Sequence, residues 1–201
     1  MQDKFRGQYR IPSARAQWWD YGWNGAYFIT GCTKNKKHYF GSISNGEMRL
    51  SRTGVVADIL WREIPHHARH ISLGAFQLMP NHFHGILILH APDGGDGDYS
   101  ASDLPTAETG HALSLQPGKK RFRNQGKNTV SSIIGGYKAA VKKHANRLGF
   151  EFDWQTRFHD HIIRNRQAFD TISQYVLYNV QNWEKDCFYT PGDNSGFPFH
   201  T

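Results

Sequence analysis

Residues 80–89, which read PNHFHGILIL, limit the fold of this chain more than any other stretch. The apolar, β-branched run that ends it predicts a β-strand. Because side chains alternate between the two faces of a strand, His82 and His84 are expected on one face and Phe83 on the other. Two imidazoles about 7 Å apart along a rigid strand can converge on one divalent metal ion, for which imidazole is a common ligand. The alternative is that one histidine packs in the core and the other lies in solvent.

The rest of the chain alternates between strand and helix patterns. Strands are predicted at 26–33, 38–43, 71–79 and 82–90. Helices are predicted at 54–64, 129–148 and 167–183, with a strand or extended connector at 152–165. The first two strands flank a polar, basic turn at 34–37 and are expected to form a hairpin.

Three segments depart from this alternation. Residues 1–24 are polar, basic and aromatic without clear periodicity, so they are expected to form an N-terminal arm. Residues 91–127 contain glycines and aspartates that cannot bury a core, and a flexible insertion is expected there. Residues 186–201 carry proline and glycine and predict an irregular tail. The insertion therefore interrupts a single predicted domain at 25–185.

The charge of the chain favours a polyanionic partner. Its 201 residues carry a formal net charge of +7, which suits contacts with nucleic-acid phosphates. A merely basic soluble protein is the alternative. Cys32 and Cys187 lie far apart and are typical of free thiols in a reducing cytoplasm. No apolar run is near the length of about 18 residues that a membrane span needs. We therefore expect a cytoplasmic, nucleoid-associated protein with no membrane partner.

Basic residues gather in three places that suit contacts with DNA. Arg10 and Arg15 alternate with aromatic residues, so guanidinium groups can meet phosphates while rings stack on unpaired bases. Packing of this arm against the domain is the alternative. A compact basic patch lies at 118–127. The expected phosphate contacts in this patch are Lys119, Lys120, Arg121 and Arg123. Arg157 and Arg164 are interpreted as further phosphate contacts, with salt bridges as the alternative.

The predicted helix at 167–183 carries a second group of chemically useful residues. Tyr175 and Asn179 are four residues apart and therefore share one helix face. If that face lies beside the histidine strand, two imidazoles, one amide oxygen and one phenol form a cluster. A tyrosyl phenol can attack a DNA strand and stay attached to it, while a divalent ion polarises the scissile phosphate. The alternative is a pair of polar residues on a solvated helix face.

Other residues compete for these roles. Tyr137 lies on the apolar stripe of its predicted helix and is expected in the core. Tyr178 is adjacent to Asn179 and therefore points about 100° away around the helix. His159 and His161 form a second His-x-His pair, which spacing alone does not distinguish from the first. This second pair could position the site, contact DNA or pack.

Three motifs resemble, as a set and in order, those of the single-tyrosine HUH transposases. They are MPNHFHG at 79–85, WQTRFHDH at 154–161 and YVLYN at 175–179. The pattern is most similar to the branch associated with repetitive extragenic palindromes (REP), and the resemblance spans about residues 9–185. It implies an α+β, ferredoxin-like fold, in which helices pack on one side of an antiparallel sheet. The strand and helix order given above agrees with that fold.

The resemblance also implies a role for each residue of the cluster. His82 and His84 are the paired ligands of Mg²⁺ or Mn²⁺, and Asn179 is the third ligand. Tyr175 is the nucleophile, which forms a 5′-phosphotyrosine and releases a 3′-hydroxyl. The family usually has Tyr-Ile-x-x-Asn-Pro, whereas this chain has valines in place of the isoleucine and the proline. Losing the proline is expected to let the helix continue and to shift Asn179.

The implied activity is that of a metal-dependent transposase. Such an enzyme is a single-stranded DNA endonuclease and strand transferase that cuts beside a hairpin formed by a palindromic repeat. The family is often dimeric, so the resemblance implies a homodimer. One alternative is a domesticated, non-catalytic protein that binds hairpin nucleic acid without a covalent product. Another is a metallohydrolase that uses water on a small substrate, against which the basic charge argues.

Overall fold

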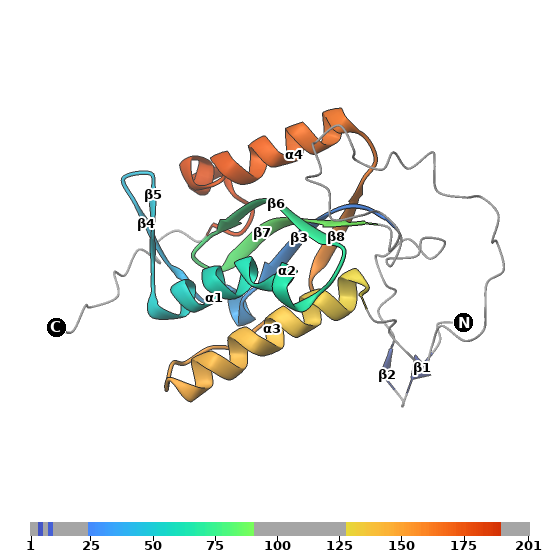
Figure 1. Ribbon diagram of the computed structural model, residues 1–201. Helices are drawn as coiled ribbons and strands as arrows, with labels where there is room; N and C mark the ends of the chain where they lie inside the picture. The colour runs from blue at the N-terminus through green and yellow to red at the C-terminus, as the bar shows by residue number, and fades with distance from the viewer. Residues whose placement is uncertain (1–3, 6–7, 10–23, 91–127, 190–201) are drawn as a thin grey trace.

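The computed structural model describes residues 4–5, 8–9, 24–90 and 128–189 (Figure 1). The predicted insertion, the end of the tail from 190 and most of the arm lie outside the described residues. So do the predicted DNA contacts Arg10, Arg15, Lys119, Lys120, Arg121 and Arg123. In the arm, two short strands, β1 (Lys4–Phe5) and β2 (Gln8–Tyr9), pair antiparallel. The division of the chain into arm, domain and tail stays a prediction.

A four-stranded antiparallel sheet forms the centre of the described structure (Figure 1). Its strands are β3 (Gly25–Cys32), β6 (Ile71–Leu78), β7 (His82–Leu89) and β8 (His159–Ile163). They lie in the order β6-β7-β3-β8, and every neighbouring pair is antiparallel. Helices α1 (Arg52–Arg62) and α3 (Val130–Arg147) connect them in the sequence order β-α-β-β-α-β. This is the ferredoxin-like, α+β fold that the resemblance implies.

The predicted hairpin between 26–33 and 38–43 is wrong. Instead, β4 (Gly41–Ser44) pairs with β5 (Glu47–Leu50) in a separate two-stranded sheet, which projects to one side in Figure 1. The turn between them is Asn45-Gly46, and both residues have a positive φ (54° and 73°). An Asn-Gly pair favours this kind of two-residue hairpin turn, so local turn chemistry decides the pairing. A short 3-10 helix, η1 (Lys34–Lys36), leads the chain away from β3.

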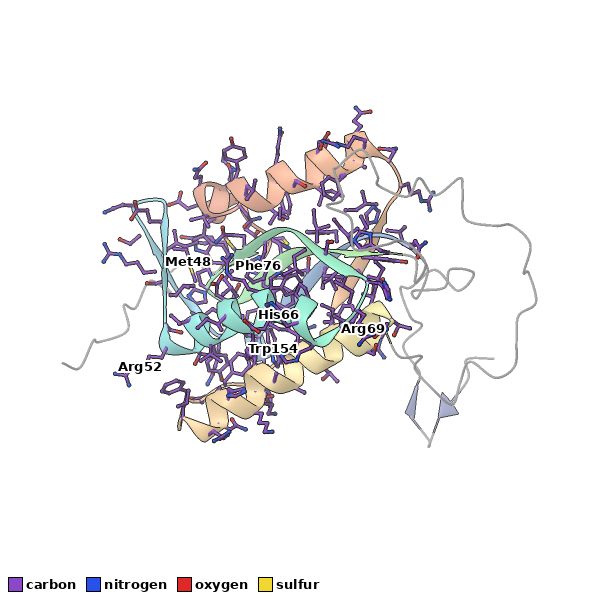
Figure 2. All side chains as sticks on the ribbon, viewed as in Figure 1. Met48, Arg52, His66, Arg69, Phe76 and Trp154 are labelled. Atoms are coloured by element: carbon purple, nitrogen blue, oxygen red, sulfur yellow. The ribbon has the colours of Figure 1, made fainter. Side chains whose placement is uncertain are left out.

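One face of the sheet packs against α1 and α3. Tyr27 and Phe83 come from the central strands, and Trp61 and Tyr137 come from the two helices. The Trp61 ring stacks on Phe76 at a centroid distance of 4.6 Å and meets Tyr137 edge-on at 5.3 Å. Figure 2 labels Phe76 and Trp154 in this layer between the sheet and the helices. These aromatic contacts form the larger of the two cores.

The opposite face packs against α4 (Arg166–Tyr178), which lies across the sheet from α1 and α3 in Figure 1. Phe169 and Ile172 of α4 contact a small cluster on this face that includes Ile86 and Ile163. The one-sided arrangement that the resemblance implies therefore holds for α1 and α3 but not for α4. The apolar residues of α4 recur every three or four positions and form one stripe that must be buried. This pattern does not specify which face of the sheet the stripe packs against.

The ends of the helices follow the local sequence. Thr129 caps α3, and its side chain accepts a hydrogen bond from the Ser132 backbone N–H. Gly149 follows that helix with φ +74°, a conformation that glycine adopts without steric cost. Pro65 lies in the first turn of a short helix, α2 (Ile64–His67), which follows α1. A final 3-10 helix, η3 (Val180–Lys185), follows α4. None of the helices in the described ranges is long and apolar enough to cross a membrane.

Candidate active site

Strand β7 places His82 and His84 on the face of the sheet that α4 covers. The two side chains lie opposite Cys32 and Thr30 of β3, while Phe83 between them points into the α1–α3 core. This is the alternation that the sequence predicts. Both histidines are fully buried, and their Nε2 atoms are 3.1 Å apart. The strand therefore brings two imidazole nitrogens to one point.

The other nitrogen of each imidazole is held by a neighbouring polar residue. Nδ1 of His82 lies 2.8 Å from Asn81 Oδ1, and Nδ1 of His84 lies 2.9 Å from Thr30 Oγ1. Asn81 also donates from Nδ2 to the Phe188 carbonyl, which turns its oxygen toward His82. His82 therefore carries its proton on Nδ1 and presents a lone pair at Nε2. Such outer hydrogen bonds are typical of metal-ligating histidines, since they fix the tautomer and the ring orientation.

Burial keeps both imidazoles uncharged at neutral pH. It lowers the pKa of His84 from 6.5 to about 4. The pKa of His82 falls well below its ordinary value, first because of burial and then because of the positive charges that His84 and Lys36 can carry. A neutral imidazole offers its lone pair to a metal ion, whereas a protonated one does not.

Helix α4 brings Tyr175 to the same place. Its phenol oxygen lies 3.3 Å from His84 Nε2, and its ring contacts the rings of His84 and Phe28. The side chain is 48% exposed, so a polymer in solution can reach it. Burial and the charge of Asp186 raise the pKa of Tyr175, while a hydrogen bond with the Asn179 side chain acts in the opposite direction.

Asn179 lies one turn after Tyr175 and is buried, with an exposed fraction of 3%. Within the described ranges its Oδ1 is buried and has no hydrogen-bond partner. Such an orphaned oxygen is costly unless a ligand or ion satisfies it. Although Val180 stands where the resemblance implies proline, α4 ends at Tyr178, and Asn179 keeps helical angles before η3 begins. The chain does continue in helical form, and the Asn179 side chain still points inward.

Asp186 was not among the residues predicted from the sequence. Its Oδ2 lies 3.8 Å from His82 Nε2, and its side chain is only 2% exposed. The backbone N–H of Phe188 donates to its other oxygen at 2.7 Å, and the Phe188 ring packs on the His82 ring at 4.5 Å. The start of the predicted tail therefore folds back onto the histidine pair. Only an acidic residue shortly after the last predicted helix could have suggested this role.

The donor atoms fit a small, hard divalent cation. One ligand atom from each of His82, His84 and Asp186 lies within 4.8 Å of the others. An octahedral ion with ligands at about 2.1 Å holds adjacent donors about 3 Å apart, and the two Nε2 atoms are 3.1 Å apart. Imidazole nitrogens, a carboxylate oxygen and the unpaired Asn179 oxygen form a mixed set that suits Mg²⁺ or Mn²⁺.

The competing residues lie elsewhere. Tyr137 is buried in the α1–α3 core, where its hydroxyl donates to the Ala57 carbonyl at 3.2 Å and burial raises its pKa. Tyr178 is 55% exposed on the outer side of α4. His159 and His161 are both exposed on the edge strand β8 and take no part in the three-residue group at His82. Within the described ranges, only the first His-x-His pair converges on one point.

The structure does not bring the two described arginine candidates together. Arg157 precedes β8 and Arg164 follows it, and both are exposed. Six residues lie between them, five of which form β8, so the two arginines are roughly 20 Å apart along the chain. Their roles as phosphate contacts stay predictions.

Comparisons with known proteins give a relative and a structural neighbour. The chain is 32% identical over 185 residues to an uncharacterized protein of Haemophilus influenzae, which covers 91% of this chain and 95% of the relative. Its structure is similar to that of the REP-associated tyrosine transposase bound to a REP hairpin, with a TM-score of 0.51 and 16% identity. That likeness covers 94% of this chain and 96% of the other, and it shows a shared fold. A scan against models of protein families finds no match.

Proposed function

On the premise that this chain belongs to the same family as the Haemophilus influenzae protein and has the fold of a REP-associated tyrosine transposase, we propose that it cleaves and rejoins single-stranded DNA. The reaction is metal-dependent, takes place beside a DNA hairpin and proceeds through a 5′-phosphotyrosine. The structural neighbour is bound to a REP hairpin, which supports hairpin DNA as the partner.

The observation that carries this proposal is the contact between Tyr175 and the histidine pair. The phenol lies 3.3 Å from His84 Nε2, which itself lies 3.1 Å from His82 Nε2. Ninety-one residues separate Tyr175 from His84 in the chain, so folding alone brings them together. A half-exposed nucleophile beside two buried, neutral imidazoles is the arrangement that covalent cleavage of a phosphodiester needs.

In the proposed reaction the Tyr175 oxygen attacks the scissile phosphorus. A bond forms between the phenolic oxygen and phosphorus, the bond from phosphorus to the 3′ oxygen breaks, and the phenolic proton passes to water. The 3′ oxygen takes a proton from water and leaves as a hydroxyl, while the 5′ end stays on the protein. Attack by a second 3′-hydroxyl on the phosphotyrosine reverses these steps and joins the strands.

His82, His84, Asn179 and Asp186 would hold the divalent ion in this reaction. A bound Mg²⁺ or Mn²⁺ supplies polarisation of the scissile phosphate and stabilises the charge that develops on it. Asn81 and Thr30 keep the two imidazoles oriented through their Nδ1 atoms. The buried surroundings keep both imidazoles neutral and available.

The test is a covalent adduct. Wild-type protein is incubated with Mn²⁺ and a labelled single strand that carries a hairpin, and the mixture is run on a denaturing protein gel. We expect a labelled protein band with the wild type and none with Tyr175→Phe. Tyr178→Phe is the matched control, because that tyrosine is similarly exposed but lies outside the site. It is expected to keep the band.

Two results would count against the proposal. A band that persists in Tyr175→Phe shows that another residue is the nucleophile. No band in any of the three proteins, together with tight binding of the hairpin, favours a non-catalytic hairpin-binding protein instead.

A further inference from the structure

A second site lies beside η1, outside the donor set described above. Residues of η1 and of the connector before β8 line a cavity of about 670 Å³ that is open to solvent. The lining residues are Lys34, Asn35, Lys36, Asp153, Trp154, Gln155 and Thr156. Pockets that hold small organic molecules have volumes of roughly 300–1,000 Å³. The cavity is therefore large enough for a nucleotide.

The lining offers hydrogen-bonding groups that the fold leaves unused. Asn35, Gln155 and Thr156 are exposed, and within the described ranges none of their side chains makes a hydrogen bond. Gln155 is held through its backbone instead, since its N–H donates to Cys32 and its carbonyl accepts from Lys138. A fixed backbone with free amide and hydroxyl groups suits recognition of the edge of an unpaired base.

The charge around the cavity suits a phosphate. Asp153 is held in ion pairs with Lys34 (3.0 Å) and Lys142 (2.7 Å), which offset its negative charge. Lys36 differs, because no carboxylate in the described ranges pairs with it. Its ammonium donates to the Cys187 carbonyl at 3.4 Å, a long contact, and lies 5.2 Å from the centre of the Phe188 ring. Lys36 is therefore the cation best able to bind a phosphate.

The cavity is close to the proposed catalytic residues. Phe188, on which Lys36 lies, packs directly on the His82 ring at 4.5 Å. Thr33, the residue before η1, donates from its hydroxyl to the Asn81 carbonyl at 2.9 Å. One layer of side chains therefore separates the cavity from the histidine pair. The cavity therefore lies within the reach of a nucleotide that neighbours one held at the histidines.

Stacking on Trp154 is not available to such a nucleotide. That side chain is buried, its Nε1 donates to the Lys138 carbonyl, and the Lys138 ammonium lies 5.3 Å from its ring centre. Figure 2 labels it inside the layer next to α3. A base in the cavity would therefore be distinguished by hydrogen bonds rather than by stacking on Trp154.

We propose that this cavity binds one unpaired nucleotide of the DNA strand next to the cleaved phosphodiester. Gln155, Asn35 and Thr156 read the base, and Lys36 binds the phosphate. The inference rests on the proposed function for the identity of the strand as DNA. The base preference of the cavity, however, is measurable by binding without cleavage.

The test measures binding in EDTA, where strand cleavage does not interfere. Fluorescence anisotropy follows labelled single strands of thymidine, adenosine or cytidine nucleotides. We expect wild type to prefer one base by about tenfold, the discrimination of one good base contact. The double variant Gln155→Ala, Thr156→Ala is expected to abolish that preference. Gln167→Ala, an exposed glutamine on α4, is the matched control and is expected to keep it.

Lys36→Ala tests the phosphate contact. It is expected to weaken binding to all three strands by a similar factor and to reduce the slope of the salt dependence by about one. Lys143→Ala changes an exposed lysine on α3 and is the matched control. It is expected to keep the wild-type order of preference among the three strands and to weaken binding less than Lys36→Ala does. Circular dichroism confirms that each variant is folded.

The outcomes separate the two proposals. A preference that survives the Gln155→Ala, Thr156→Ala change, or a wild type without any preference, overturns the cavity assignment even if the Tyr175 adduct forms. A preference that the double variant loses supports the cavity assignment even if no adduct ever forms, in which case the proposed cleavage fails alone.

Discussion

Acidification of the metal-free protein should destabilise the fold through its buried histidines. In the unfolded chain the His84 imidazole takes up a proton as the pH falls through about 6.5, whereas in the folded chain burial delays this to about 4. Between these values the unfolded state binds more protons than the folded state. The free energy of unfolding therefore falls as the pH falls through this window, and it is fully present above it.

The size of the effect follows from the two pKa values. For a folded pKa of about 4 and an unfolded pKa of 6.5, moving from about pH 7.5 to about pH 5 costs about 2 kcal/mol. The side chain is only 2% exposed, so solvent does not screen this cost appreciably. His82, whose pKa is also lowered by burial, adds to the loss. Because the two Nε2 atoms are 3.1 Å apart, their protons are taken up as a coupled pair.

The measurement is urea unfolding in EDTA at both pH values for wild type and for His84→Asn. The substitution removes the titrating group, so the variant is expected to lose about 2 kcal/mol less than wild type on acidification. The quantity compared is the change in the free energy of unfolding between the two pH values. Any stability that the substitution removes at both pH values cancels in this difference. His161→Asn, an exposed histidine on β8, is the matched control and should behave as wild type. If His84→Asn and wild type lose the same free energy, burial does not hold this imidazole neutral.

Two further changes test the packing and the donor set. Gly85→Ala should lower the free energy of unfolding by about 1–3 kcal/mol, measured by urea unfolding, because a Cβ there would overlap the ring of the buried Trp61; unchanged stability would mean that this ring moves freely. Asn179→Ala should weaken Mn²⁺ binding at least about tenfold by calorimetry, because it removes the buried oxygen that has no protein partner; unchanged affinity would exclude this oxygen as a ligand.

Local sequence patterns predict most of the elements of this fold. The alternation in 82–89 gives both the strand β7 and the shared face of its histidines, which the structure confirms. The apolar stripe and the Thr129 cap give α3 with nearly correct ends. These features are decided within a few residues, by the pleat of a strand or the period of a helix, so the sequence contains them directly.

Features that depend on distant partners were not predictable in the same way. Strand β3 is buried on both faces, so its residues indicate a strand without indicating which segments pair with it. Its true neighbours are β7 and β8, fifty or more residues away, rather than the adjacent 38–43. Asp186 reaches His82 only because η3 turns the chain back over the site. No spacing rule connects two residues through such a turn.

The charges around Tyr175 explain why the proposed function includes a divalent ion. Burial raises the pKa of the phenol, and the nearby Asp186 raises it further, so the folded chain favours the protonated form. The opposing contribution comes from a neutral amide, Asn179, rather than from a lysine or an arginine. The donors His82 and His84, by contrast, are kept neutral and aimed at one point. The chain thus provides a site for a positive charge beside the phenol but does not supply that charge itself. A cation held there would offset the negative charge of Asp186 and would also stabilise the phenolate of Tyr175.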